Sequence, residues 1–184
     1  MAEQAIIAQF LEVRTEEAFC ALFEAVCVRV RRYFLLRGLD AATAEDLTQN
    51  VFVKVYGGAG ELREAAAFYG WLFAIARNEL VSYWRREQPR LAQTEALSEQ
   101  PPHSLKIEPE AMAALRMMDL LNALEPAERD LIVLRFVEGL SYEELAAALK
   151  LPLGTVKWRI FNARKKLAHA VGNSPADKKR QRTN

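Results

Sequence analysis

Residues 140 to 168 read LSYEELAAALKLPLGTVKWRIFNARKKLA, and this stretch predicts two short helices joined by a tight turn. Ser141 is a favourable N-cap, and Glu144 three residues later can reach back to the Ser141 amide, which is the capping-box pattern of a helix start. Lys150 is expected in the turn, and Pro152 is expected to open the second helix, where its missing N–H costs little. The pattern is that of a helix-turn-helix.

The second of these helices carries apolar residues on one face and mainly cationic or polar residues on the other. The apolar stripe consists of Val156, Ile160, Ala163 and Leu167. The opposite face suits a DNA groove, because cations pair with phosphates and Lys, Arg, Asn and Thr form hydrogen bonds with base edges. The candidate DNA-contacting residues are Thr155, Lys157, Trp158, Arg159, Asn162, Arg164 and Lys165.

Charge segregation distinguishes this helix from an ordinary amphipathic surface helix with a solvated charged face. Residues 125 to 144 contain six acidic and two basic residues, whereas residues 150 to 166 contain six basic residues and no acidic one. A merely solvated face usually mixes its signs. The segregation favours nucleic-acid binding by residues 150 to 166.

The composition of the whole chain excludes several classes of protein. Its 184 residues carry a net charge of +1 and are 51% hydrophobic, which is enough for one large or two small cores and does not indicate a general polyanion binder. No signal peptide, membrane-inserting segment or lipidation motif is recognisable, so a cytoplasmic protein is expected. The sequence shows no catalytic constellation, cofactor-binding motif or metal-ligand cluster, and we expect neither an enzyme nor a metalloprotein.

The remainder of the chain predicts an all-α fold, because strand signals are almost absent. Helical spacing of apolar residues appears over residues 15 to 37, 42 to 56, 65 to 86, 110 to 124 and from 126 onward. In the second segment the apolar positions leave an outward stripe of Glu45, Asp46, Gln49, Asn50 and Val53. Cys20 and Cys27, the only two cysteines, are expected as core thiols, since their spacing within one helix is too long for a disulfide.

A change of composition divides the chain. Residues 89 to 108 contain three prolines with Gln, Ser and Glu and lack apolar periodicity, so they predict a flexible linker. The expected organisation is a first helical domain over residues 1 to 88, the linker, a helix-turn-helix domain over residues 109 to 171, and a basic, disordered tail over residues 172 to 184.

Three motifs in this order resemble the bacterial sigma factors of RNA polymerase, specifically the small extracytoplasmic-function (ECF) group. The motifs are AEDLTQNVFVKVY at residues 44 to 56, FYGWLFAIARNELVSYWRR at residues 68 to 86, and the segment from residue 121 to 167 that includes the helix-turn-helix. The resemblance covers nearly the whole chain. It implies a promoter-specificity subunit that recognises the minus-35 element as duplex and melts the minus-10 element, with core RNA polymerase, promoter DNA and an anti-sigma protein as partners.

The resemblance also implies roles for two groups of residues in the first domain. The helix over residues 42 to 56 would dock on the clamp helices of the largest polymerase subunit, through Glu45, Asp46, Gln49, Asn50 and Phe52. The aromatic-rich helix would capture the unpaired minus-10 strand, since unstacked bases need flat side chains and nearby cations. The residues expected nearest that strand are Trp71, Asn78, Tyr83, Trp84, Arg85 and Arg86. Core packing is an alternative for Trp71, and the more favoured one for Phe68 and Phe73.

The sequence departs from the family pattern at three positions. Ser82 stands where these proteins often have Asp, Lys150 replaces the usual turn Gly, and Trp158 occupies a position commonly held by Ser. Lys150 costs about 1 kcal/mol if its backbone is left-handed. The indole of Trp158 would contact either a thymine methyl or a partner protein.

Two other classes of function remain as alternatives. A polymerase-independent helix-turn-helix regulator would have a similar GTVK turn, but it predicts an upstream dimerisation or phosphoacceptor domain that the sequence does not show. An all-helical interaction module that mimics an anti-sigma antagonist is disfavoured by the basic helix. In vitro transcription with purified core enzyme would discriminate between these classes.

Overall fold

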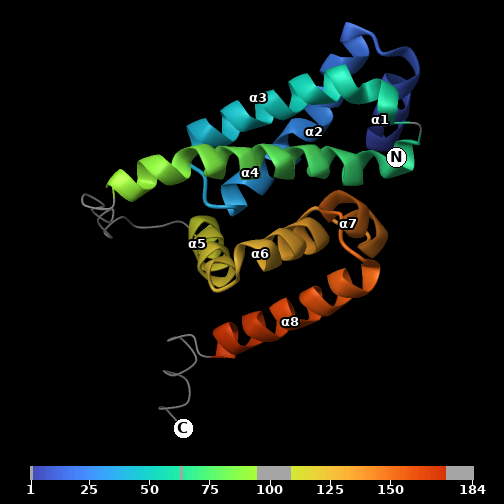
Figure 1. The fold of residues 1–184 in the computed structure, drawn as a ribbon. Coiled ribbons are helices and arrows are strands. Elements are labelled where there is room, and N and C mark those ends of the chain that lie inside the picture. Colours follow the sequence, from blue (N-terminus) through green and yellow to red (C-terminus); the bar gives the residue numbers. More distant parts are fainter. Residues whose placement is uncertain (1, 63, 95–108, 173–184) are drawn as a thin grey trace. The chain divides into compact units, whose positions relative to one another are not determined.

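The structure, a computed structural model, describes residues 2 to 62, 64 to 94 and 109 to 172. Every regular element in these ranges is helical, so the prediction of an all-α fold is confirmed (Figure 1). The chain divides into two compact units: most of the described residues up to 94 belong to the first, and those from 109 onward belong to the second. Each unit has its own buried apolar core.

Within the described residues, the first unit contains four α-helices and a short connection of two 3₁₀ turns. Their bounds are α1 Ala2–Val13, α2 Glu16–Leu36, α3 Ala41–Gly58, η1 Ala59–Glu61, η2 Ala65–Ala67 and α4 Phe68–Thr94. Helices α3 and α4 run side by side in opposite directions, because the short η1–η2 connection turns the chain back on itself (Figure 1).

The core of this unit is built on one stripe of α2. Leu22, Val26 and Val30 are fully buried, as the apolar spacing of residues 15 to 37 predicts. At the C-terminal end of the helix, the ring of Tyr33 meets that of Phe73 from α4 edge to face, with 5.7 Å between centroids, a favourable aromatic geometry. The prediction that both cysteines are core thiols is wrong. Cys20 is exposed because it lies off the buried stripe, and Cys27 is half-buried.

Helix α1 was not predicted from the sequence, although Ile6, Ile7 and Phe10 have helical spacing. Ile7 and Phe10 are almost completely buried, and α1 packs against the η2 turn. Its N-terminal end is held by Glu3, whose carboxylate accepts hydrogen bonds from Arg29 at 3.2 Å and from the hydroxyl of Tyr69. The short helix therefore takes its stability from tertiary contacts, as expected for a helix of twelve residues.

Helix α3 begins at a well-formed cap and is joined to α4 by a charge pair. The Asp40 carboxylate accepts hydrogen bonds from the amides of Ala42 and Thr43, both at 3.0 Å, and the bond from Thr43 is the main reason that the pKa of this carboxyl is lowered. Further along α3, the ammonium of Lys54 pairs with the buried carboxylate of Glu79 on α4. These contacts set where α3 starts and link it to α4.

Helix α4 extends farther than the sequence predicted. We expected the linker to begin at Pro89, but the helix continues through this proline to Thr94. A proline lacks the N–H that would donate to the carbonyl four residues earlier, and its ring crowds that carbonyl. This bends a helix but does not always end it. The remainder of the predicted linker, residues 95 to 108, and the predicted tail from residue 173 onward lie outside the described residues.

The second unit is the helix-turn-helix domain. Its elements are α5 Pro109–Asn122, α6 Pro126–Ile132, a π-helical turn η3 Val133–Val137, α7 Tyr142–Leu149 and α8 Leu153–Gly172. The predicted capping box is present at the start of α7, where the Glu144 amide donates to Ser141 Oγ at 3.1 Å and the Ser141 amide donates to Glu144 at 2.7 Å. Helices α5, α6 and α7 all pack against α8, so α8 is the element around which this domain is organised.

The turn between α7 and α8 contains a strained residue. Lys150 has φ 53° and ψ 47°, in the left-handed region, which costs an L-residue with a Cβ about 1 kcal/mol. The amide of Leu151 donates to the Ala146 carbonyl at 3.0 Å, a bond typical of a helix C-terminus that ends in this conformation. Lys150 therefore lies in the turn as expected from the sequence, and its left-handed conformation ends α7 so that α8 can pack against it.

Replacing Lys150 by Gly should therefore stabilise the second domain, because glycine adopts the left-handed conformation without the Cβ clash. We expect the free energy of unfolding to rise by about 1 kcal/mol, which corresponds to about 4 to 8 °C in the midpoint of a domain of this size. Thermal unfolding of the full chain, followed by circular dichroism, measures the change. Lys150→Ala is the matched control: it removes the same charge but keeps a Cβ, so a stabilisation of equal size would contradict the backbone explanation.

Candidate nucleic-acid interface

The outward face of α8 brings together the centre of the predicted DNA-contacting set. Trp158, Asn162 and Lys165 follow one another at intervals of four and three residues, so they lie on one side of the helix. The opposite side is buried through Val156 and Ile160. Trp158 is 65% exposed, an unusually large exposed fraction for an indole, and it stands in the middle of this face.

The other cationic residues predicted to contact DNA lie on the two flanks of α8. On one flank, the Lys157 ammonium lies 5.9 Å from the centroid of the Tyr142 ring, and the Arg164 guanidinium lies 6.0 Å from that of Phe136. Arg164 also borders an apolar groove of about 420 Å³ between α5 and α8, so it is turned away from Trp158. Arg159 lies on the other flank of the helix.

Two details of this face were not predicted. Phe161 is 57% exposed and lies beside Trp158, and its ring is covered by the Lys165 ammonium at 4.7 Å. The sequence could have revealed this position, because a residue three places after Trp158 lies on the same side of a helix. Lys166, by contrast, forms an ion pair of 2.8 Å with Glu128 at the start of α6, so its charge is partly neutralised within the domain.

Helix α3 presents the predicted polymerase-facing stripe, with one correction. Asp46, Gln49 and Asn50 are exposed, while Glu45 is half-buried and pairs with Arg31 of α2 at 3.3 Å. Phe52 does not belong to this surface: it is only 2% exposed. Its ring meets the Phe23 ring of α2 edge to face, with 4.8 Å between centroids. Its position along α3 places it on the buried side, which the apolar pattern around Val51 and Val53 did not reveal.

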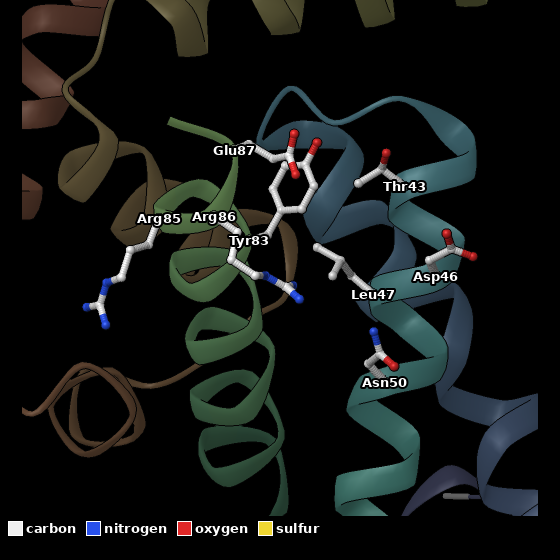
Figure 2. A pocket seen from close by; sticks show the side chains of 8 residues that line it. All are labelled: Thr43, Asp46, Leu47, Asn50, Tyr83, Arg85, Arg86 and Glu87. Atoms are coloured by element: carbon white, nitrogen blue, oxygen red, sulfur yellow. The ribbon is translucent and has the colours of Figure 1, made fainter. Parts of the chain in front are cut away.

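The residues predicted to contact the minus-10 strand are distributed over different sides of α4. Asn78 and Arg85 are exposed and seven residues apart, so they share the outward face. Tyr83 and Trp84 are half-buried, with their rings edge to face at 5.2 Å. In Figure 2, Arg85 points away from α3 whereas Arg86 extends toward it. The structure therefore does not gather this set into one surface.

Trp71 is half-buried at the start of α4. Its ring packs beside Phe68, with 6.3 Å between centroids. It also approaches Gly58 so closely that a Cβ at Gly58 would lie 3.1 Å from the indole. Phe68 and Phe73 are fully buried, in agreement with the reading of both as core residues. Trp71 thus combines a packing contact with a partly open ring.

A cleft of about 610 Å³ lies between the N-terminal half of α3 and the C-terminal half of α4. Figure 2 shows the eight side chains that line it. From α3 these are Thr43, Asp46, Leu47 and Asn50, and from α4 they are Tyr83, Arg85, Arg86 and Glu87. The cleft thus joins residues of the predicted polymerase-facing stripe to residues of the predicted minus-10 set.

The described residues show no group of three or more His, Cys, Asp or Glu side chains that could hold a metal ion. None of the helices in the described ranges is both long and apolar enough to cross a membrane. The features that carry chemical information are therefore the cationic and aromatic face of α8, the polar stripe of α3 and the side chains of α4.

Family models match both units of the chain. The model described as Sigma-70 region 2 matches residues 22 to 90, and the model described as Sigma-70, region 4 matches residues 114 to 167. The first match covers α3 and most of α4, and the second covers the helix-turn-helix. The two sites described above thus fall in separate regions of one family.

Curated relatives extend the similarity over almost the whole chain. The chain is 32% identical over 191 aligned positions to the ECF RNA polymerase sigma-E factor of Escherichia coli strain K12, covering 93% of this chain and 97% of the relative. It is 36% identical over 144 positions to the RNA polymerase sigma-H factor of Pseudomonas aeruginosa, covering 72% and 75% of the two chains.

Solved structures share the fold. CnrH, solved in complex with the cytosolic domain of CnrY, has a TM-score of 0.69 at 24% identity over 95% of this chain and 100% of that chain. The sigma factor RpoE of Bartonella quintana, solved in complex with the anti-sigma factor NepR, has a TM-score of 0.66 at 24% identity over 85% and 98%. With both family regions matched in order, the chain belongs to the ECF group of the sigma-70 family, and it is a sigma factor that directs promoter-specific transcription by RNA polymerase.

Proposed function

We propose that the two domains of this sigma factor divide promoter recognition between them. The second domain reads the minus-35 element as duplex DNA through α8, and the first domain docks on core RNA polymerase through α3 and melts the minus-10 element through α4. The observation that carries this proposal is the outward face of α8, where cations and exposed rings occupy a helix that has no acidic residue.

The polymerase-independent regulator is not favoured, because the region 2 match over residues 22 to 90 assigns the first domain to the sigma-70 family. An anti-sigma protein is a further proposed partner, since CnrH and the Bartonella RpoE were both solved with partner proteins, and NepR is described as an anti-sigma factor. As a partner of RNA polymerase, the chain would act in the cytoplasm.

The minus-35 interface should separate residues that read bases from residues that pair with phosphates. Trp158 and Phe161 offer apolar surface of the kind that contacts thymine methyl groups, and Asn162 offers an amide that can read adenine. Arg159 can reach guanine from the flank of α8. Lys165 has a flexible stem and a mobile ammonium suited to a phosphate oxygen.

We expect Arg159→Ala to cost about 1 to 3 kcal/mol of binding free energy and to relax specificity at one position. Lys165→Ala should weaken binding to all minus-35 sequences and reduce the slope of log affinity against log salt by about one. Fluorescence anisotropy with minus-35 duplexes at several salt concentrations measures both effects. Lys166→Ala is the matched control: its ammonium is paired with Glu128, so its slope should change less. Identical behaviour of all three variants would contradict the assignment.

Docking on core polymerase should depend on the exposed part of α3. We expect Asp46→Arg combined with Gln49→Ala to weaken binding to core enzyme without loss of helicity, because both side chains point away from the buried Leu47 and Val51. Binding is measured by anisotropy of a labelled full chain. Glu24→Arg, an exposed charge reversal on α2, serves as the control. Undiminished binding of the α3 variant would remove this helix from the polymerase interface.

Strand opening should depend on the aromatic side chains of α4. The half-buried Trp84 keeps part of its ring accessible, and a base–aromatic stack contributes about 1 to 3 kcal/mol. We expect Trp84→Ala to reduce open-complex yield on a duplex promoter and to leave minus-35 binding nearly intact. Permanganate reactivity of unpaired thymines reports the yield.

A template with a pre-melted minus-10 bubble is the control for this experiment, because the cost of unpairing has already been met there. It should restore much of the yield lost by Trp84→Ala. Normal permanganate reactivity of the variant on the duplex promoter would exclude Trp84 from strand opening.

A further inference from the structure

The cleft between α3 and α4 joins two surfaces that the sequence assigned to different partners. Asp46 and Asn50 were expected to face core polymerase, and Tyr83 and Arg86 were expected to face unpaired DNA. All four line the same cleft of about 610 Å³. The four residues therefore border one continuous surface rather than two separate ones.

The rotation of α4 places Tyr83 on the α3 side. Ala76 and Leu80, respectively seven and three residues earlier, are 0% and 1% exposed, and residues at these intervals share one face of a helix. Tyr83 therefore continues the buried stripe of α4 beyond the point where the core ends. In Figure 2 its ring lies between the two helices, opposite Leu47 of α3.

The next two arginines point in different directions. Arg86 extends into the space between the helices on the side of Asn50, whereas Arg85 lies on the far side of α4 (Figure 2). Arg86 Nε also donates to the Ser82 carbonyl at 3.3 Å, which holds the base of its side chain against α4. Adjacent residues on a helix differ by about 100° in direction, so both arginines border the cleft but only the side chain of Arg86 extends between the two helices.

The charges of the cleft suit a protein better than a polyanion. Its lining is of mixed charge, with two carboxylates, Asp46 from α3 and Glu87 from α4, and two arginines, Arg85 and Arg86. A strand of DNA entering it would bring phosphates beside these carboxylates, and like charges at short range repel. The DNA-facing helix α8 differs in this respect, because it has no acidic residue from Lys157 to Lys166.

We propose that Tyr83 and Arg86 belong to the polymerase-docking surface together with Asp46 and Asn50, and that the cleft receives a segment of core RNA polymerase. The complementary segment is amphipathic. It presents a basic side chain to Asp46, a carboxylate to Arg86 and an apolar side chain to Tyr83 and Leu47. This inference rests on the proposed docking role of α3. It restricts the DNA-facing surface of α4 to its outward side, which carries Asn78 and Arg85.

The test measures binding of the labelled full chain to core RNA polymerase in the absence of DNA. Tyr83→Ala and Arg86→Glu should each weaken this binding by about tenfold, the loss typical of a side chain at the centre of an interface. Arg85→Glu is the matched control: it makes the same charge reversal one residue away, on a side chain that borders the cleft but points away from α3. It should change core binding by less than about twofold. Tyr83→Phe keeps the ring and should bind like the unmodified chain.

Helicity and thermal unfolding of each variant are measured first. If Tyr83→Ala is destabilised, Arg86→Glu against Arg85→Glu decides the question, because both are surface substitutions. Equal weakening by the two charge reversals would overturn the proposal, as would unchanged core binding of Arg86→Glu. If Arg86→Glu binds core normally but loses affinity for a pre-melted promoter bubble in the assembled holoenzyme, the cleft is a DNA surface instead.

Asp46→Arg, measured in the same titration, separates this inference from the proposed function. If Asp46→Arg weakens core binding and the Tyr83 and Arg86 variants do not, only the extension of the docking surface into the cleft is wrong. If Asp46→Arg binds normally while Arg86→Glu does not, docking uses α4, and the proposed role of the α3 stripe is wrong.

Discussion

Burial of one stripe of α4 is the constraint on which the surfaces of the first domain depend. Leu72, Ala76 and Leu80 are at most 1% exposed, and removing such residues from water is the main favourable contribution to the packing of a helix. Because the stripe fixes the rotation of α4 about its axis, it also determines which later side chains face α3 and which face outward. The division between Tyr83 and Arg85 follows directly from this packing, and Lys54 and Glu79 add a polar link between the two helices.

The same constraint operates in the second domain, with a different result. Val156, Ile160 and Ala163 are buried, and the remaining sides of α8 carry cationic residues together with the exposed rings of Trp158 and Phe161. The capping box of Ser141 and Glu144 fixes where α7 starts, and the left-handed turn at Lys150 fixes where it ends. The short, strained turn at Lys150 therefore sets the direction of α8, and most of the exposed side of α8 suits DNA.

A sigma factor has to bind a protein and a polyanion, and the two surfaces that we propose for these roles differ in charge. The outward stripe of α3 carries Asp46 beside the neutral Gln49 and Asn50, whereas α8 carries only basic charges on its exposed face. Charge of one sign on a surface accelerates association with the right partner and disfavours the wrong one. In the proposed assignment the two sides of α4 have different partners, because Tyr83 lies on the side of α3 and Arg85 on the outward side.

The all-α fold, the helix-turn-helix with its caps and strained turn, and the membership in the sigma-70 family could be predicted from the amino-acid sequence, because each of these depends on local spacing along the chain. Four other features became clear only from the folded chain: Phe52 is buried, α1 packs as a helix, α4 continues beyond Pro89, and Tyr83 and Arg86 line a cleft with Asp46. They could not be predicted because periodicity identifies a buried face only where one apolar stripe dominates. Aromatic side chains are distributed around α4, and Phe52 lies between two valines, so contacts with neighbouring helices chose which rings are buried.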